Sequence, residues 1–220
     1  MQRLIIAIDG PSGAGKGTIS GAIAKSLGYR HVDTGAMYRA VAWKATHEGI
    51  PLDDESAVSS LATRAKIVVE GGVASIDGHD VTRAIRTPEM DKAAASVARL
   101  PRVREILVAR QRALGQSGGV VMEGRDIGTV VFPNADVKIY LDASPEERAR
   151  RRLRDTAHSG GQAGQAAVAA SIDARDKADT TRTVSPLTLA RDAVLVDTTG
   201  VPIADVVDRV MLLVSSKMSV

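Results

Sequence analysis

Residues 10–18 read Gly10-Pro11-Ser12-Gly13-Ala14-Gly15-Lys16-Gly17-Thr18, and this stretch decides what kind of fold the chain adopts. The apolar run Leu4-Ile5-Ile6-Ala7-Ile8 before it is typical of a parallel strand that is buried on both faces. After it, apolar residues recur at helical spacing as far as Leu27. The order strand, glycine-rich loop, helix predicts an α/β fold with a parallel sheet.

The loop itself has the composition of an anion-binding site. Its glycines let backbone N–H groups turn toward phosphate oxygens, where a Cβ would obstruct them. The helix that begins near Lys16 presents its positive end to the same anion, and the Lys16 ammonium bridges β- and γ-phosphates. We predict that residues 10–18 bind ATP and that Lys16 is catalytic. The alternative interpretation is a glycine-rich surface turn.

One position departs from the general phosphate-loop pattern, which has Ser or Thr directly after the lysine. Gly17 stands there and Thr18 follows it. A direct hydroxyl ligand for Mg²⁺ is therefore missing at this position. We expect magnesium to be held through phosphates and water, and Thr18 to lie on a phosphate.

The rest of the chain alternates between strand and helix patterns, with one exception. Residues 66–81 read strand, turn, strand, turn, which predicts a small antiparallel unit inserted into the α/β chain. Residues 156–170 are rich in Gly, Ala and Gln and are predicted to be mobile. Further strands are predicted at 29–32, 119–122, 137–141 and 193–196. Further helices are predicted at 33–43, 52–65, from 87, at 102–114, from 144, at 168–180 and at 203–214.

Composition excludes several classes of protein. The chain has no cysteine, which excludes disulfides, thiolate metal sites and a thiol nucleophile. Aromatic residues make up only 2%, so aliphatic residues must build the core. The run at 4–8 is too short for a signal peptide or a membrane span, which favours a cytoplasmic protein. The net charge of +3 suits an anionic partner without choosing between a nucleotide and a nucleic acid.

The sequence Gly-Lys-Gly-Thr at 15–18 resembles the nucleoside monophosphate kinases, and further stretches resemble the bacterial cytidylate kinase family among them. These stretches match that family in order and spacing along nearly the whole chain. They are Ile8-Asp9-Gly10 through Thr18, Asp33-Thr34-Gly35-Ala36-Met37-Tyr38-Arg39, Pro101-Arg102-Val103-Arg104, Glu123-Gly124-Arg125-Asp126-Ile127-Gly128-Thr129-Val130-Val131-Phe132-Pro133, and Arg175-Asp176 with Asp179 and Arg182.

The resemblance implies a fold and an activity. The fold is one domain over 1–220, with a three-layer P-loop NTPase core at 1–62 and 102–220. A small antiparallel β insert at about 63–101 belongs to the monophosphate-binding region, and a mobile lid covers about 148–170. The activity is ATP-dependent phosphorylation of CMP and dCMP with Mg²⁺, by a monomer without nucleic-acid or membrane partners. A kinase for UMP or AMP is the alternative.

The resemblance also implies roles for individual residues. Thr34 and Arg39 contact the acceptor nucleotide, Arg39 at its phosphate, and Arg125, Arg175 and Arg182 surround the phosphates. Arg104 and Asp126 read the cytosine edge, and Asp179 contacts the sugar. Arg125 and Arg175 are expected to be catalytic together with Lys16. The complete CMP-binding set is Thr34, Arg39, Arg104, Arg125, Asp126, Arg175, Asp179 and Arg182. Glu123, where many relatives have Asp, is expected to hold Mg²⁺ through water.

These residue types suit phosphoryl transfer between two anions. The acceptor is a phosphate oxygen that needs no strong general base, so positioning and positive charge do the work. Arginine grips phosphate with two parallel hydrogen bonds. The carboxylate of Asp126 accepts a hydrogen bond from the cytosine amino group and repels the carbonyl of uracil.

Each of these residues also has an interpretation without function. Arg175, Asp179 and Arg182 are spaced i, i+4, i+7 and could form a solvated helix face. Glu123 could cap a strand end, and Arg125-Asp126 could be a structural ion pair. Of the basic run at 148–154, helical spacing allows one or two arginines to reach ATP. A nucleotide-dependent switch or nucleic-acid binder is disfavoured, because a guanine motif and interleaved aromatic residues are missing.

Overall fold

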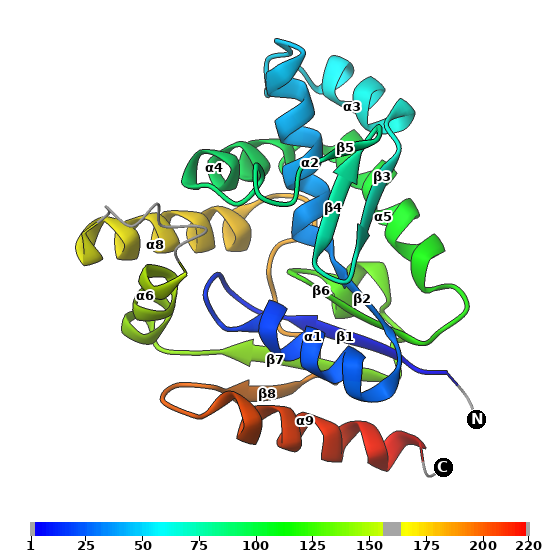
Figure 1. The fold of residues 1–220 in the computed structure, drawn as a ribbon, viewed down its shortest axis with the longest axis vertical. Coiled ribbons are helices and arrows are strands. Elements are labelled where there is room, and N and C mark those ends of the chain that lie inside the picture. The colour runs from blue at the N-terminus through cyan, green and yellow to red at the C-terminus, as the bar shows by residue number, and fades with distance from the viewer. Residues whose placement is uncertain (1–2, 156–163, 219–220) are drawn as a thin grey trace.

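The computed structural model describes residues 3–155 and 164–218, which form an α/β structure around one parallel sheet. The sheet has five strands in the order β2-β6-β1-β7-β8. A second, antiparallel sheet has the order β3-β4-β5. Figure 1 shows the large sheet in the lower half of the molecule and the small sheet beside the helices of the upper half.

The described elements follow the predicted alternation. The strands of the large sheet are β1 (Ile5–Asp9), β2 (Arg30–Asp33), β6 (Val120–Gly124), β7 (Val137–Asp142) and β8 (Val194–Asp197). Those of the small sheet are β3 (Ile67–Glu70), β4 (Val73–Ile76) and β5 (His79–Asp80). The helices are α1 (Lys16–Leu27), α2 (Thr34–His47), α3 (Glu55–Arg64), α4 (Pro88–Val97), α5 (Pro101–Gly115), η1 (Ile127–Val131), α6 (Pro145–Arg154), α8 (Gln165–Thr181) and α9 (Ile203–Met218).

The large sheet is covered on both faces, so the core has three layers. Side chains alternate along β1: Ile6 and Ile8 join a cluster with α1 and α9, and Ala7 joins a cluster with α5 and η1. Both clusters are aliphatic except for partly buried Tyr29 and Phe132 at their edges, as the aromatic content of 2% requires. The predicted three-layer α/β core is therefore confirmed.

A separate apolar cluster holds the upper half of the molecule together. It joins α2, α3, α4, the N-terminal half of α5 and the small sheet, and its fully buried members include Val41, Leu61, Ile76 and Leu107. Asp54 caps α3 by accepting a hydrogen bond from the backbone of Ala57. The predicted antiparallel unit is present at 67–80, with strand β5 as an addition that the sequence pattern did not indicate.

Two local predictions need correction. The expected helix start at 168 is three residues late, so residues 165–170 of the segment that was expected to be mobile are helical. Their alanines favour a helix, and Val168 packs with Ile172 and with Ala149 of α6. The remaining part of that segment, 156–163, lies outside the described residues. The π-helical turn η1 was not predicted either.

No helix within 3–155 or 164–218 is both long and apolar enough to cross a membrane.

Candidate active site

The glycine-rich loop joins β1 to α1 and takes a shape that its glycines make possible. Gly13 and Gly15 have φ angles of 81° and 90°, a region that L side chains rarely adopt. A Cβ on Gly13 would lie 3.0 Å from the carbonyl oxygen of Arg148, so α6 also packs directly against the loop. Gly15 caps α1 without a side chain, which leaves the first amides of that helix facing the loop.

Lys16 lies beneath this loop and is only 8% exposed. Its Nζ donates hydrogen bonds to the carbonyl oxygens of Gly10 at 2.8 Å and Pro11 at 2.7 Å. Burial, followed by the positive charge of Arg125, lowers the pKa of Lys16 to about 7. The structure thus holds the amino group of Lys16 at the loop. Burial and the neighbouring Arg125 disfavour its charged form, so an anion bound at the loop would stabilise it.

Helices α6 and α8 reach the loop from the other side of the cleft. The Ser12 amide donates to Asp176 Oδ1 at 2.9 Å, and Arg152 Nη2 donates to Ser12 Oγ at 2.8 Å. Arg148 and Arg151 donate to the carbonyl oxygens of Ser12 and Ala14. Part of the basic run therefore faces the loop, whereas the Arg150 side chain is 47% exposed and pairs with Glu147.

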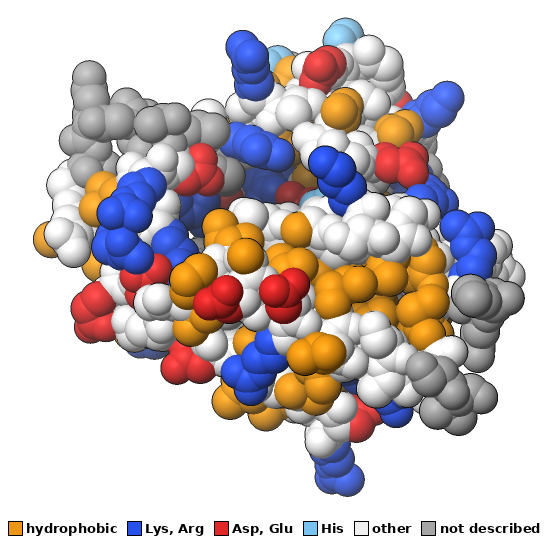
Figure 2. All heavy atoms as spheres, turned by 60° about the horizontal axis from the view of Figure 1, so that its bottom comes forward, with side chains coloured by type: hydrophobic (Ala, Val, Ile, Leu, Met, Phe, Trp, Pro, Cys, Tyr) orange, Lys and Arg blue, Asp and Glu red, His pale blue; other side chains and the backbone are white. Residues whose placement is uncertain are grey.

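The loop opens into a cleft of 1290 Å³. Figure 2 shows this hollow with Lys and Arg side chains inside it and around its rim. Ten of the predicted site residues line it, although they come from distant parts of the chain: Ser12, Gly13, Gly15, Lys16, Gly17, Thr18, Arg39, Glu123, Arg125 and Arg175. Arg152 of the basic run lines it as well. Residues of the loop, β6, α2, α6 and α8 therefore meet in the lining of this cleft.

Four further predicted residues, Arg104, Asp126, Asp179 and Arg182, form a buried network with Arg125 next to the cleft. Arg104 of α5 pairs with Asp126 after β6, and these side chains are 3% and 8% exposed. Arg125 Nε lies 2.8 Å from Asp179 Oδ2 of α8. Arg182 follows α8 and lies 3.7 Å from both Asp126 Oδ1 and Asp179 Oδ1. Arg125 and Asp126 thus each have a different partner, so they do not form the ion pair that was considered as an alternative.

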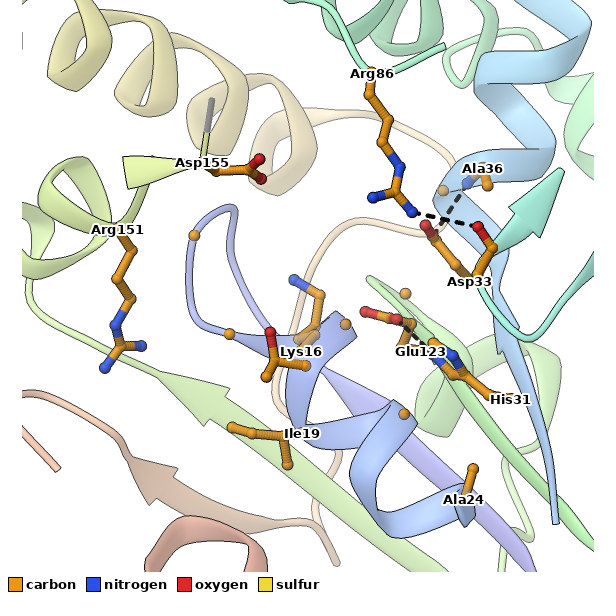
Figure 3. A pocket seen from close by; sticks show the side chains of 18 of the residues that line it. Lys16, Ile19, Ala24, His31, Asp33, Ala36, Arg86, Glu123, Arg151 and Asp155 are labelled. Atoms are coloured by element: carbon orange, nitrogen blue, oxygen red, sulfur yellow. Dashed lines mark hydrogen bonds and ion pairs between the residues drawn. The ribbon is translucent and has the colours of Figure 1, made fainter. Parts of the chain in front are cut away.

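Glu123 is the penultimate residue of β6, lies beside the loop and is 5% exposed. Its Oε1 lies 2.8 Å from His31 Nε2 of β2, and the Thr34 hydroxyl donates to its backbone carbonyl at 2.7 Å. A Cβ on Gly17 would lie 3.4 Å from Glu123 Oε1, so the carboxylate sits directly against the start of α1. Figure 3 shows Lys16 and Glu123 projecting toward the same cavity, with His31 next to Glu123.

His31 supplies a polar partner for the Glu123 carboxylate. Burial disfavours its charged form, but the hydrogen bond and the negative charge of Glu123 outweigh burial, so the pKa of His31 lies above its ordinary value. The sequence carried little signal for this contact, because 92 residues separate the two positions.

Two acidic residues of the site were not predicted at all. Asp9 ends β1 and accepts hydrogen bonds from the amides of Ile127 and Gly128, both at 2.8 Å, which fixes the start of η1. Burial raises the pKa of Asp9 to about 6. Asp91 of α4 lies among arginines, with Arg175 Nη1 at 2.6 Å. A lone aspartate in a helix, such as Asp91, gives no sequence signal for such a contact. Asp9 directly precedes the glycine-rich loop, and this position is the signal that could have identified it.

The fold and the cleft define a P-loop phosphotransferase, with a triphosphate loop on one side and a set of arginines on the other. A model of the family described as cytidylate kinase matches residues 6–216. The cytidylate kinase of Desulfitobacterium hafniense (strain Y51) is 50% identical over 220 residues, which cover 99% of this chain and 95% of that protein. The cytidylate kinase of Solibacter usitatus (strain Ellin6076) is 47% identical with the same coverage.

The chain belongs to the cytidylate kinase family. A solved structure of an uncharacterized protein from Eubacterium ventriosum covers 97% of this chain, with a TM-score of 0.54 and 8% identity. At that identity the likeness concerns the fold alone.

Proposed function

We propose that this protein transfers the γ-phosphate of ATP to CMP and dCMP, and so makes CDP and dCDP in pyrimidine nucleotide metabolism. The observation that carries the proposal is the junction of the glycine-rich loop with an arginine-lined cleft, directly beside the buried pair of Arg104 and Asp126. Its relatives over nearly the whole chain are named cytidylate kinases, which favours CMP over UMP or AMP as the acceptor.

On the donor side, residues 10–18 hold the triphosphate of ATP. The amides of the loop and of the first turn of α1 face the phosphates, because Gly13 and Gly15 permit the required backbone angles. Lys16 leaves the carbonyl oxygens of Gly10 and Pro11 and bridges the β- and γ-phosphates. This exchange replaces two neutral partners by a strongly anionic one.

On the acceptor side, the predicted set is proposed to bind CMP. Arg39, Arg125, Arg175 and Arg182 bind phosphate, and Thr34 and Asp179 contact the nucleoside. Arg104 and Asp126 read the base: the carboxylate of Asp126 accepts from the exocyclic amino group of cytosine. Uracil places a carbonyl there instead, so two acceptors would face each other in a buried site.

The transfer itself requires positioning rather than a general base. The attacking oxygen belongs to the phosphate of CMP and is already anionic near neutral pH. Lys16, Arg125 and Arg175 offset the charge that develops as the γ-phosphoryl group moves in line from ADP to the acceptor. The lid, about 148–170, is proposed to exclude water during transfer. Its arginines Arg148, Arg151 and Arg152 contact the loop, and its part 156–163 lies outside the described residues.

Magnesium fits this site as a partner of ATP. Among the described residues, no group of three or more His, Asp or Glu side chains could hold the ion. The carboxylate of Glu123 lies against Gly17 at the start of α1, and Mg²⁺ in kinases is held by one or two carboxylates together with substrate phosphates and water. When bound, the ion neutralises phosphate charge and orients the triphosphate.

We further propose that the chain acts as one domain and as a monomer in the cytoplasm, where ATP and nucleoside monophosphates occur. Its core comprises 1–62 and 102–220, and its monophosphate-binding insert comprises about 63–101. The predicted site residues lie together within one chain, which supports the monomer. Gel filtration with light scattering tests the monomer.

A panel of nucleoside monophosphates, assayed with ATP and Mg²⁺, tests the function. We expect CMP and dCMP to be the preferred acceptors, and preference for AMP or UMP would overturn the assignment. The Lys16→Ala variant is expected to lose turnover while its circular dichroism spectrum stays unchanged. A near-normal rate in that variant would contradict the role of the loop.

A further inference from the structure

Asp91, on helix α4, is surrounded by arginines from three other elements. Arg175 Nη1 of α8 lies 2.6 Å from Asp91 Oδ1, and Arg39 Nη1 of α2 lies 3.8 Å from the same oxygen. Arg152 Nη1 of α6 lies 3.6 Å from Asp91 Oδ2. The Asp91 side chain is 15% exposed, so these contacts are largely shielded from water.

The three arginines all line the cleft beside the glycine-rich loop. Arg39 and Arg175 are also predicted to bind the phosphate of the acceptor, and Arg152 donates to Ser12 in the loop. A carboxylate and a phosphate monoester present similar groups to a guanidinium, since each offers at least two oxygens and a negative charge. Asp91 Oδ1 therefore lies where a phosphate oxygen would meet Arg39 and Arg175.

Charge explains why a carboxylate is useful at this point. The side chains of Arg39, Arg152 and Arg175 are between 10% and 18% exposed, and Arg125 adds another positive charge nearby. Several shielded guanidinium groups without a counter-ion repel one another and lose hydration. Asp91 offsets this cost, and it links α4 to both α6 and α8.

We propose that Asp91 is an internal surrogate for the acceptor phosphate, which holds Arg39, Arg152 and Arg175 together until the phosphate of a nucleoside monophosphate takes them over. This inference rests on the proposed function. Binding of the acceptor then requires that the phosphate compete with Asp91 for the same arginines. After transfer, the carboxylate recaptures them and assists release of the product.

The Asp91→Asn variant tests the proposal, because it removes the charge and keeps the shape. We expect its dissociation constant for CMP, measured by calorimetry, to fall about three- to tenfold below that of the wild type. We also expect a lower KM for CMP without a higher kcat. An unchanged or larger dissociation constant would overturn the proposal. If Asp91 only oriented the arginines for CMP, its replacement would weaken CMP binding and raise the dissociation constant.

Glu89→Gln is the matched control, since it removes one negative charge from an exposed position on the same helix. We expect it to leave CMP affinity unchanged, and an equal gain in affinity would show a general charge effect and overturn the proposal. Asp91→Ser is the second variant if Asp91→Asn does not fold. The wild-type acceptor panel separates the two proposals: phosphorylation of CMP with no gain in Asp91→Asn rejects the surrogate alone, whereas an inactive wild type rejects both.

Discussion

His31 Nε2 on β2 lies 2.8 Å from Glu123 Oε1 on β6, and this contact holds the carboxylate that faces the glycine-rich loop. The two strands are neighbours in the parallel sheet, with Asp33 opposite Glu123 in register. His31 therefore lies two residues back on the same face of the sheet, within reach of the Glu123 side chain. A buried carboxylate that loses such a partner keeps the full cost of its burial.

The first prediction concerns this pair. His31→Leu leaves Glu123 without this hydrogen bond, and we expect the free energy of unfolding near neutral pH to fall by about 1–3 kcal/mol. Urea denaturation measures the change. The double variant His31→Leu/Glu123→Met removes both polar groups and is expected to recover most of the loss. Additive losses in the double variant would show that the two side chains act independently.

The second prediction concerns the proton on Lys16. Its pKa of about 7 means that much of the lysine is neutral above pH 7, and the negative charge of a bound triphosphate is expected to raise that pKa. We expect ATP binding at pH 8 to take up a proton, so the affinity for ATP falls as the pH rises from 7 to 9. Calorimetry in buffers of different ionisation enthalpy counts the protons.

Lys16→Arg is the control for this measurement, because a guanidinium stays charged over that range. We expect the variant to bind ATP without the proton uptake. The same uptake in wild type and Lys16→Arg would assign the proton to another group.

The third prediction concerns the choice of base. Asp126→Asn replaces a group that only accepts by one that both accepts and donates, so uracil is no longer repelled. We expect the ratio of kcat/KM for CMP over UMP to fall at least about tenfold, the effect of roughly one hydrogen bond in a buried site. An unchanged ratio in the steady-state assay would remove Asp126 from base recognition.

The fourth prediction concerns Asp9, whose pKa in the folded protein is about 6 against an ordinary value of 3.8. Between these two values the unfolded chain releases the proton first, so rising pH favours unfolding. We expect this group to lower the free energy of unfolding by up to about 3 kcal/mol from pH 4 to pH 6.5. Urea titrations of the wild type and of Asp9→Asn at several pH values measure it.

Asp9→Asn cannot ionise, so the difference in stability between the wild type and the variant is expected to shrink or reverse as the pH rises. The variant also loses one acceptor for the amides of Ile127 and Gly128, which gives an offset that does not depend on pH. Parallel pH profiles for the two proteins would show that Asp9 does not titrate in this range.

Sequence patterns predicted the elements that depend on local chemistry. The buried strand β1, the glycine-rich loop and α1 are adjacent in the chain, and the uninterrupted aliphatic run of β1 indicated a sheet covered on both faces. The antiparallel pair β3 and β4 followed from its turns. The turn η1 escaped prediction because its first amides bond to the side chain of Asp9, which lies 118 residues earlier in the chain.

By itself, the sequence determined the phosphate loop, the α/β class and the residues available for phosphoryl transfer, since spacing along one strand, loop or helix is a local property. Only the tertiary structure decided which charges meet. Arg125 pairs with Asp179, Arg104 with Asp126, and Asp91 gathers arginines from three elements. The energy of such pairs depends on distance and burial in the folded chain, and separation in sequence specifies neither.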